Sequence, residues 1–377
     1  MSRIVISNKP SLSREGGPAT AGPGGLKDLI HSQNIIGLSP MDGYTDEAFR
    51  LVVTKISKPD VIFTEFVSAE GLSRGGVKLY DTLLFSSIEH PIVGQLFGKD
   101  PEAFYKSAII ICHLGFDGID INMGCPAKTV TQHGSGAALI GQPDLASEII
   151  KSAQSGVSDW FNKKVSINDL QLNNKTLDVI SRNIKYSNIP LLVKGGARGG
   201  LKPTISVKTR IGIEKPVTQD WISHLLKHNL DFITVHGRTL NQGYSGTADW
   251  EEIKKAVDIA KGSNTLIWGN GDIQSRQQGI DYCQKYGVTG VLIGREALGN
   301  PWAFCDKVPD IKEKFQTMVL HANLFQQIFP HRLFDGLRKN FLLYTSGHPH
   351  AKRLRAKLVR LNSLPELYAL EDEFLNC

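Results

Sequence analysis

Gly118-Ile-Asp-Ile-Asn-Met-Gly-Cys-Pro126 is the stretch of this chain that says most about its fold. Its first part is a short apolar run bounded by turn residues, which is typical of a buried strand. Gly124 and Pro126 hold Cys125 on a rigid turn just beyond the end of that strand. A ligand bound above the strand end would meet the thiol of Cys125 and the amide of Asn122 together. The stretch therefore predicts a strand end that carries out chemistry on a flat, polar ligand.

Similar β-rich runs recur along the chain and predict eight strands: Ile35–Ser39, Val61–Thr64, Ile92–Leu96, Gly118–Asn122, Ile205–Thr209, Phe232–His236, Thr265–Gly269 and Gly290–Ile293. Amphipathic helical patterns lie between most of them: Pro101–Leu114, Leu145–Gln154, Gln219–His228, Trp250–Ala260 and Arg276–Tyr286. Eight strands alternating with helices predict an α/β fold, a parallel (β/α)8 TIM barrel. A doubly wound open sheet is the main alternative. The count of eight, and polar residues at nearly every strand's carboxyl end, favour the barrel.

Three regions depart from this alternation. Residues 1–33 form a lead-in rich in glycine and proline, for which we expect a flexible segment. Within the barrel, at 34–309, residues 155–203 are too long for a simple connection and predict an insertion, although Ile189–Lys194 is a second candidate for the fifth strand. After Trp302 the pattern is helical only. A small all-α domain is predicted at 310–377, with helices at Phe315–Phe329, Arg332–Thr345 and His350–Leu361.

Composition narrows the class of protein. The chain has 377 residues, 41% of them hydrophobic, and 37 glycines, which suits a soluble globular α/β protein. It contains no run of about 18 apolar residues and no signal-peptide pattern at its start, so we expect no membrane association. Its five cysteines are scattered singly. That pattern argues against a zinc or other metal site and favours a reducing compartment, the cytoplasm. No obligate protein partner is evident.

Positive charge gathers near the carboxyl terminus. Between His331 and Arg360 the only acidic residue is Asp335. The basic residues of this region are Arg332, Arg338, Lys339, Lys352, Arg353, Arg355, Lys357 and Arg360. A patch of this kind favours a polyanionic partner such as nucleic acid, although a solvated helix face has the same composition.

Polar residues follow the predicted strands in order: Ser39-Pro40-Met41, Glu65, Gln95, Asn122 with Cys125, Lys208 with Arg210, His236 with Arg238, Asn270-Gly271-Asp272, and Gly294-Arg295. The last two groups resemble a phosphate-binding site, because glycines expose backbone N–H groups. Gln95 and Asn122 could hydrogen-bond the amide edges of a ring, and Lys208 could neutralise a developing negative charge. Each of these residues also has a purely structural alternative: a turn, a cap, a surface lysine, a core histidine for His236, or an inert buried thiol for Cys125.

Taken together, these motifs resemble the tRNA-dihydrouridine synthases, FMN-dependent (β/α)8 barrel enzymes with a C-terminal helical RNA-binding domain. The matching pieces are Ser39-Pro-Met-Asp-Gly-Tyr-Thr-Asp46, Phe49-Arg50, Asp120-Ile-Asn-Met-Gly-Cys-Pro126, Gly134-Ser-Gly-Ala-Ala-Leu139, Val207-Lys-Thr-Arg-Ile-Gly212, Val235-His-Gly-Arg-Thr239, Asn270-Gly-Asp272 and Gly294-Arg295. The resemblance covers residues 34–305 apart from the insertion, and more faintly 337–355. The family's Arg-Lys-His run is here Arg338-Lys339-Asn340.

The resemblance implies a role for each matching residue. Cys125 would be the general acid, and Arg210 and Arg238 would contact substrate. The residues that would hold FMN are Ser39, Pro40 and Met41 along the flavin, Gln95 and Asn122 at the ring edge, Lys208 at its N1/O2 side, His236 near the ring, and Asn270, Gly271, Asp272, Gly294 and Arg295 at the phosphate. In the helical domain, Arg338, Lys339, Arg353 and Arg355 would bind tRNA. The Lys-Thr-Arg-Ile-Gly context favours Lys208 over Lys194 as the flavin lysine.

The implied reaction reduces the C5–C6 double bond of specific uridines in tRNA. NADPH or NADH would reduce FMN, flavin N5 would deliver hydride to uracil C6, and Cys125 would protonate C5 of a flipped-out base. Two alternatives remain. One is an FMN oxidoreductase of the dihydroorotate type that acts on a small molecule, which would not need the basic helical region. The other is a non-catalytic RNA-binding barrel, against which the presence of Cys125, Lys208 and His236 counts.

Overall fold

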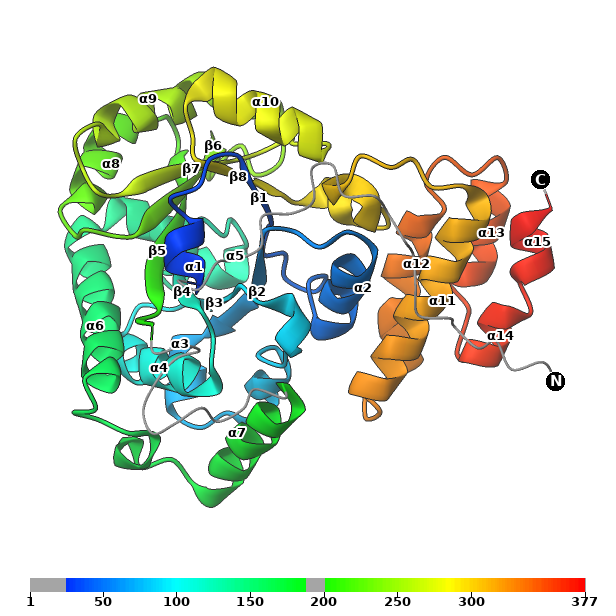
Figure 1. The fold of residues 1–377 in the computed structure, drawn as a ribbon, viewed down its shortest axis with the longest axis horizontal. Coiled ribbons are helices and arrows are strands. Elements are labelled where there is room, and N and C mark those ends of the chain that lie inside the picture. The colour runs from blue at the N-terminus through cyan, green and yellow to red at the C-terminus, as the bar shows by residue number, and fades with distance from the viewer. Residues whose placement is uncertain (1–24, 188–200, 377) are drawn as a thin grey trace.

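Eight parallel strands close into a barrel in this computed structural model, which describes residues 25–187 and 201–376 (Figure 1). The strands are β1 (Ile35–Leu38), β2 (Val61–Ser68), β3 (Ile92–Phe97), β4 (Gly118–Met123), β5 (Thr204–Gly212), β6 (Phe232–Thr239), β7 (Leu266–Asn270) and β8 (Gly290–Ile293). Each strand pairs with the next, and β8 pairs with β1, so the sheet has no free edge. The predicted barrel is confirmed, and this closure excludes the open sheet.

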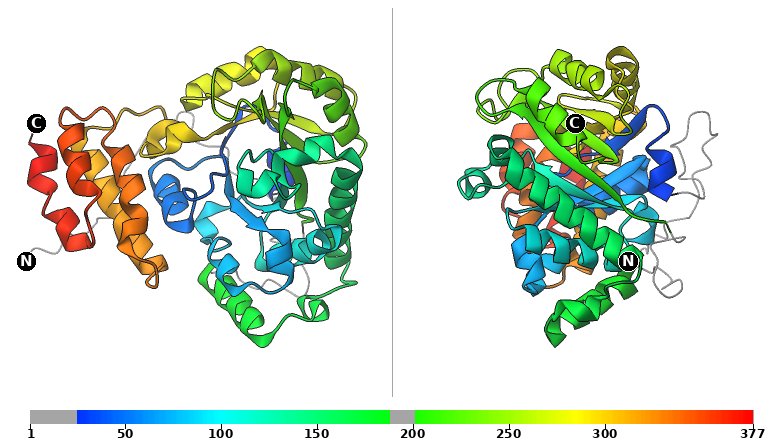
Figure 2. Two further views of the ribbon diagram at one scale, coloured as in Figure 1. Left: turned by 180° about the vertical axis from the view of Figure 1, so that it is seen from behind. Right: turned by 90° about the vertical axis from the view of Figure 1, so that its left-hand side faces the viewer.

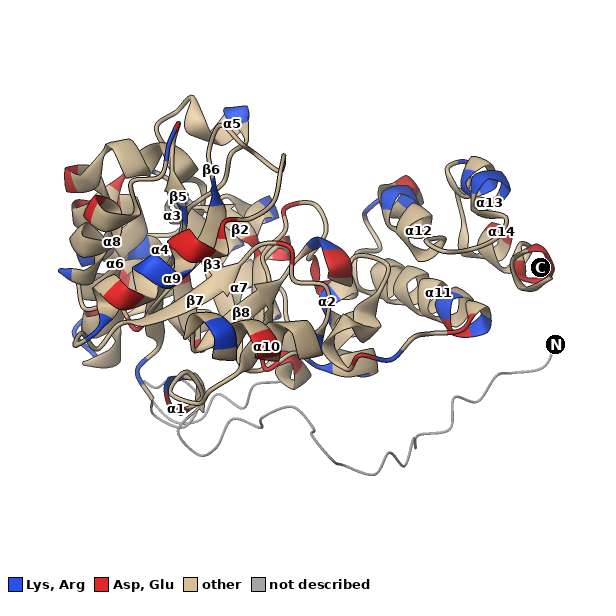
Figure 3. Cartoon of the chain, turned by 90° about the horizontal axis from the view of Figure 1, so that it is seen from above, with Lys and Arg blue, Asp and Glu red and all other residues tan. Residues whose placement is uncertain are grey.

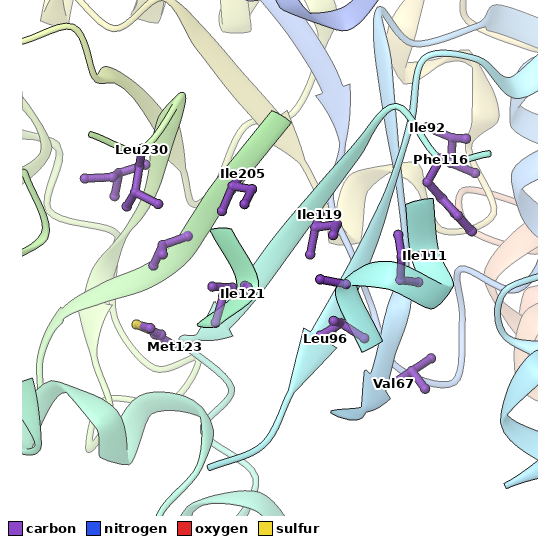
Figure 4. Packing of buried hydrophobic residues seen from close by; sticks show 14 of the residues in the cluster. Val67, Ile92, Leu96, Ile111, Phe116, Ile119, Ile121, Met123, Ile205 and Leu230 are labelled. Carbon is purple, nitrogen blue, oxygen red and sulfur yellow. The ribbon is translucent and has the colours of Figure 1, made fainter. Parts of the chain in front are cut away.

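Strand β4 explains why the opening stretch has its sequence. Side chains alternate across a strand, so Ile119, Ile121 and Met123 point to one face and Asp120 and Asn122 to the other. The apolar set joins the large hydrophobic cluster between the strands and the surrounding helices (Figure 4). The polar set faces the barrel interior, where its hydrogen bonds lie with β3 and β5. A single strand thus builds the core and the site at once.

The amino end of the barrel interior is filled by aromatic rings. Phe232 stacks on Trp268 with centroids 4.3 Å apart, and Phe63 meets both rings edge-on. Helix α1 (Gly25–Leu29) covers this end, because Leu26 and Leu29 belong to the same hydrophobic cluster. The lower barrel is therefore solid, and the only end left to polar side chains is the carboxyl end of the strands.

Helices surround the barrel and mostly match the predicted ones. They are α2 (Glu47–Ser57), α3 (Ala69–Ser73), α4 (Pro101–Leu114), α5 (Lys128–Thr131), α6 (Pro143–Phe161), α7 (Asn174–Ser187), α8 (Thr218–Leu226), α9 (Trp250–Ala260) and α10 (Arg276–Tyr286). One prediction is wrong: residues 155–161 belong to α6 and not to the insertion. Gly156 lies where α6 crosses α4, and a Cβ there would come within 2.5 Å of the Tyr105 carbonyl oxygen. That glycine permits close helix packing instead of ending the helix.

The remaining insertion contains α7, which packs on a short 3-10 helix at Val77–Asp81. Thr176 Oγ1 donates to the Gly75 carbonyl at 2.9 Å, and Asn183 Nδ2 donates to the Tyr80 carbonyl at 2.8 Å. Residues 1–24 of the predicted lead-in lie outside the described residues, as does the alternative strand at Ile189–Lys194. For residues 25–29 the prediction of a flexible segment is wrong, because they form α1, whose leucines are buried against the barrel. The described fifth strand is the predicted one, extended to Gly212.

Five helices follow the barrel and stand to one side of it: α11 (Ile311–Ile328), α12 (Arg338–Tyr344), α13 (Ala351–Leu358), α14 (Leu364–Tyr368) and α15 (Glu371–Leu375) (Figure 1, Figure 2). Asp310, the predicted boundary, caps the first turn of α11 by accepting from Glu313 N at 2.7 Å. The predicted helix at Arg332–Thr345 begins too early, because residues 334–337 form a 3-10 turn. Helices α14 and α15 were not predicted.

These helices share a hydrophobic cluster that also takes in Ala48 of α2. Phe49 of α2 meets His321 of α11 with ring centroids 5.9 Å apart. Helix α2 therefore joins the barrel to the C-terminal helices, and a separate helical domain at 310–377 stays a prediction. No helix within residues 25–187 and 201–376 is long and apolar enough to cross a membrane.

Replacing Gly156 with alanine tests the close packing of α4 and α6. The new Cβ would lie 2.5 Å from the Tyr105 carbonyl oxygen and 3.0 Å from Ala108 Cβ, so one helix must move. We expect Gly156→Ala to lower the free energy of unfolding by about 1–3 kcal/mol, measured by urea denaturation. The exposed neighbour Ser155 is the control, and Ser155→Ala should change it by no more than about 0.5 kcal/mol. Equal stability of the two variants would contradict this packing.

Candidate active site

A cavity of about 670 Å³ opens at the carboxyl ends of the strands. All fifteen barrel residues that the sequence predicts for the site line it: Ser39, Pro40, Met41, Gln95, Asn122, Cys125, Lys208, Arg210, His236, Arg238, Asn270, Gly271, Asp272, Gly294 and Arg295. A volume of this size suits a cofactor together with part of a substrate. The strand order along the chain therefore becomes a ring of functional groups around one pocket.

The floor of the cavity is a chain of hydrogen bonds that starts at a buried carboxylate. Gln95, Asp120 and Ser206 are register neighbours on β3, β4 and β5. Asp120 accepts from Gln95 Nε2 at 2.7 Å and from Ser206 Oγ at 2.6 Å. Gln95 Oε1 then accepts from Asn122 Nδ2 at 2.9 Å. Asn122 Oδ1 accepts from the backbone N–H of Cys125 at 2.8 Å, which connects the carboxylate to the cysteine turn.

The charge on Asp120 fixes the direction of every amide in this chain. Burial raises the pKa of Asp120 to about 6, so the carboxyl is ionised at neutral pH and can only accept. Gln95 must turn its NH₂ toward Asp120 and its oxygen toward Asn122. Asn122 must in turn present its oxygen to the cysteine turn. If the amides were turned the other way, the NH₂ group of Asn122 would face the backbone N–H groups of Gly124 and Cys125, which are also donors. The carboxylate at one end of the hydrogen-bond chain and these N–H groups at the other therefore require the same amide orientation.

Lys208 and His236 both line the cavity, and their protonation states differ. Lys208 Nζ donates to Asn270 Oδ1 at 2.9 Å, and burial, followed by the nearby Arg210, lowers the pKa of Lys208 to about 8. Burial and four surrounding cations hold the pKa of His236 well below its usual value. Arg238 Nη1 lies 3.3 Å from His236 Nε2, and a guanidinium only donates. His236 is therefore neutral, with Nε2 as acceptor and the proton on Nδ1.

Arg210 and Arg238, predicted to contact substrate, are almost wholly buried and hold backbone carbonyls. Arg210 donates to the carbonyls of Gly124, Thr239 and Gly243 at 2.8, 2.9 and 2.8 Å. Arg238 donates to the carbonyls of Ser245 and Gly246 and forms an ion pair with Asp272 at 2.7 Å. The Asp272 carboxylate also accepts from Arg295 at 2.9 Å. The main contribution of both arginines in this structure is to fix the loop after β6.

Cys125 is half buried at the wall of the cavity. Ala137 N–H donates to the Cys125 carbonyl at 3.1 Å, and Asn122 Oδ1 takes the Cys125 N–H, so the turn is fixed on both sides. Burial is the main cause that raises the pKa of the Cys125 thiol. The thiol is therefore protonated at neutral pH. Among residues 25–187 and 201–376, no three His, Cys, Asp or Glu side chains are grouped to hold a metal ion.

The structure also places residues in the site that the sequence did not predict. Phe66, and not Glu65, lines the cavity, because a β-bulge between Phe63 and Phe66 shifts the register of β2 and pairs Phe66 with Gln95. Tyr44 and Tyr244 lie at the cavity wall. Asp120 lies beneath it. Asp120 stood in a quoted motif, and its position two residues before Asn122 on an alternating strand was the available signal.

The four basic residues predicted in the C-terminal helices do not line the cavity. Lys and Arg gather on α12 and α13 (Figure 3), but several are held within the protein. Arg338 donates to the Leu361 carbonyl at 3.0 Å, Arg353 pairs with Glu373 at 3.0 Å, and Arg355 donates to Thr345 Oγ1 at 2.8 Å. Lys339 is different: its Nζ lies 4.5 Å from the ring centroid of Tyr44, at the cavity rim.

Comparison with known proteins gives a consistent match along the chain. A family model described as dihydrouridine synthase matches residues 37–184 and 197–375. A probable tRNA-dihydrouridine synthase from Staphylococcus aureus (strain Mu50 / ATCC 700699) is 34% identical over 347 residues, covering 89% of this chain and 92% of that protein. A probable tRNA-dihydrouridine synthase 2 from Bacillus subtilis (strain 168) is 33% identical over 348 residues, covering 89% and 93%. Solved structures are more distant: DHODH from Eimeria tenella, in complex with ferulenol, is 13% identical with a TM-score of 0.47, over 80% of this chain and 85% of that one.

Exchanging the charge and the amide on β4 tests the polarity of the floor. In Asn122→Asp, two carboxylates compete for the single NH₂ of Gln95, and we expect a loss of about 1–3 kcal/mol in unfolding free energy at neutral pH. Asp120→Asn alone should cost less, because its new amide oxygen can still accept from Gln95. The double variant Asp120→Asn/Asn122→Asp lets Gln95 turn over and satisfies every group again. Urea denaturation of all four proteins should give a double variant more stable than Asn122→Asp alone. If the losses of the two single variants simply add up in the double variant, the oriented chain of hydrogen bonds is contradicted.

Proposed function

Because the chain belongs to the dihydrouridine synthase family, we propose that it is a flavin-dependent tRNA-dihydrouridine synthase that reduces the C5–C6 double bond of uridines in tRNA. One observation carries the proposal. A protonated thiol on a fixed turn, a floor of oriented amides and a buried lysine line the same cavity. Reduction of a uracil ring places a hydride on one carbon and a proton on the next, and the thiol is a proton donor for the second of these.

The cavity suits FMN in size and in the chemistry of its wall. Gln95, Asn122 and Lys208 offer hydrogen-bonding groups for the edge of a flavin ring. At the other side, a Cβ on Gly294 would come within 3.7 Å of Met41 Sδ and Ser39 Cβ, so a larger side chain would fill this space. Gly271, Gly294 and Arg295 would hold the phosphate, with Asp272 acting through its ion pair to Arg295. NADPH, or NADH, is the proposed reductant.

In the proposed reaction, bound flavin would supply hydride to C6 of the uracil. Cys125 Sγ–H would donate a proton to C5, so the ring gains one hydride and one proton and the thiolate is reprotonated from water. The raised pKa of Cys125 keeps this proton in place until it is needed. Lys208, when charged, would stabilise negative charge that develops beside it. Neutral His236 would accept at Nε2 only from Arg238 and keeps that guanidinium oriented.

The substrate we propose is tRNA, with the basic face of α12 and α13 at its phosphates. Among the four predicted residues, Lys339 is the best placed, because it reaches the cavity rim at Tyr44. We propose residues 310–377 as the helical tRNA-binding region.

The free cysteines among the described residues support a reducing compartment such as the cytoplasm. They are Cys112, Cys125, Cys283 and Cys305.

Cys125→Ala tests the reaction. The variant should bind FMN as the wild type does, because its backbone N–H still bonds Asn122. It should lose most dihydrouridine formation, by about 100-fold or more, since general acid catalysis contributes factors of that order. Mass spectrometry of tRNA after incubation with NADPH measures the product. Cys305→Ala, which changes an exposed thiol, is the control. A fully active Cys125→Ala protein would reject the acid role. Wild-type protein that reduces free pyrimidines and does not bind tRNA would reject the proposed substrate.

Lys208 predicts how flavin affinity depends on pH. With a pKa of about 8, Lys208 loses its charge as the pH rises from about 7 to 9. We expect the affinity of the flavin-free protein for FMN to fall about tenfold over this range, because a charge-assisted hydrogen bond is replaced by a weaker one. Quenching of FMN fluorescence gives the dissociation constants. Lys208→Met should bind weakly at every pH, with a flatter profile. An unchanged profile in that variant would assign the effect to another group.

A further inference from the structure

Tyr244 lies at the mouth of the cavity with its ring in solvent. Of the described Phe, Trp and Tyr side chains it has the largest exposed fraction, 60%. It also lines the cavity that holds Cys125 and Lys208. A ring in this position adds little to the hydrophobic core, and most of its surface is open to a molecule that binds at the cavity.

The backbone around this exposed ring is fixed by two buried arginines. The residue before Tyr244, Gly243, gives its carbonyl to Arg210 at 2.8 Å. The residue after it, Ser245, gives its carbonyl to Arg238 at 3.2 Å. Arg210 and Arg238 are 1% and 2% exposed. Burying a guanidinium is costly unless it is well hydrogen-bonded, and here two of them clamp the carbonyls on either side of one solvent-exposed residue.

The same clamp sets Tyr244 in a fixed relation to the cysteine turn. Arg210 Nε donates to the Gly124 carbonyl at 2.8 Å, next to Cys125, while its Nη1 holds the Tyr244 loop. One guanidinium thus connects the reacting turn to the exposed ring. Whatever rests on Tyr244 is positioned relative to the thiol.

The ring is also surrounded by positive charge. The guanidinium carbons of Arg210 and Arg295 lie 5.7 and 5.5 Å from its centroid. The Arg295 side chain is 54% exposed. An exposed aromatic ring in cationic surroundings at the mouth of a cavity suits the base of a nucleotide, which stacks on the ring.

We infer that Tyr244 is a stacking platform for an RNA base adjacent to the uridine that enters the cavity, an inference that rests on the proposed function. A uridine that leaves its helix takes away the stacking partner of its neighbour. Tyr244 replaces that partner at the cavity mouth, and its clamp aligns the uracil with Cys125. Tyr244 is therefore a positioning residue for the substrate.

The test compares Tyr244→Ala, Tyr244→Phe and a control, Tyr186→Ala, which removes an exposed tyrosine on α7 that lies outside both the cavity and residues 310–377. Tyr244→Ala should lower kcat/KM for tRNA roughly 10- to 100-fold, the range found for the loss of one stacked base. Tyr244→Phe should stay within about threefold of wild type, because stacking needs the ring and not the hydroxyl. FMN content and the rate at which NADPH reduces the flavin without tRNA are measured in all three, so that a loss of tRNA modification per bound FMN is assigned to the substrate.

Activity on a tRNA with an abasic nucleotide beside the modified uridine separates stacking from a purely structural role of Tyr244, because a structural role would not depend on the neighbouring base. Two such substrates, one on each side of the uridine mapped by mass spectrometry, are compared with intact tRNA. One of them should lower the activity of wild-type enzyme to that of Tyr244→Ala, and should lower Tyr244→Ala little further. If both abasic substrates slow the two enzymes by equal factors, the ring does not stack on a neighbouring base and the inference is wrong.

Other outcomes separate this inference from the proposed function. Binding of tRNA is measured by fluorescence anisotropy alongside turnover, so the effect of the substitution does not depend on activity alone. If wild type modifies tRNA and Tyr244→Ala equals it, the inference fails and the proposed function stands. If Tyr244→Ala slows only flavin reduction by NADPH, the ring serves the dinucleotide and the inference is overturned. If wild type neither binds nor modifies tRNA, the proposed function fails, and the inference with it.

Discussion

The carboxylate of Asp120 is the constraint on which the site depends. It lies inside a closed barrel, where its hydrogen-bond donors among the described residues are its register neighbours on β3 and β5. Because it can only accept, it sets the direction of the Gln95 and Asn122 amides and, through them, of the cysteine turn. The parallel strands place these side chains around the cavity. The buried charge of Asp120 then decides which of their groups act as hydrogen-bond donors and which as acceptors.

Much of this arrangement could be predicted from the sequence, because it follows local rules. Alternation along Gly118–Met123 separates core from site, and the carboxyl ends of parallel strands meet at one end of a barrel. Helices α9 and α10 begin and end at the predicted residues, since their apolar spacing and caps are regular. All predicted barrel site residues consequently face one cavity.

The parts that could not be predicted depend on contacts between distant segments. A bulge in β2 shifts the strand register, so that Phe66 and not Glu65 lines the cavity, and no local sequence pattern predicts this bulge. Gly156 resembles a helix end in sequence but is a crossing point in space. Arg210 and Arg238 lie at the carboxyl ends of strands, where ligand-binding residues are expected, yet both donate to backbone carbonyls of the loop after β6. The carbonyls that Arg210 reaches are 29 and 33 residues further along the chain, and those that Arg238 reaches are 7 and 8 residues further along. Which group an arginine reaches is decided by tertiary structure.

Helix α2 limits how freely the parts of this protein can be exchanged. It begins directly after the rim segment that contains Met41 and Tyr44, and Ala48 on its buried side belongs to the cluster of the C-terminal helices. The cavity rim and the helical region are therefore connected through one helix. A hybrid built by joining the barrel of one relative to the helices of another would need a matching α2 surface, so the junction for such a graft lies near residue 47 as much as near 310.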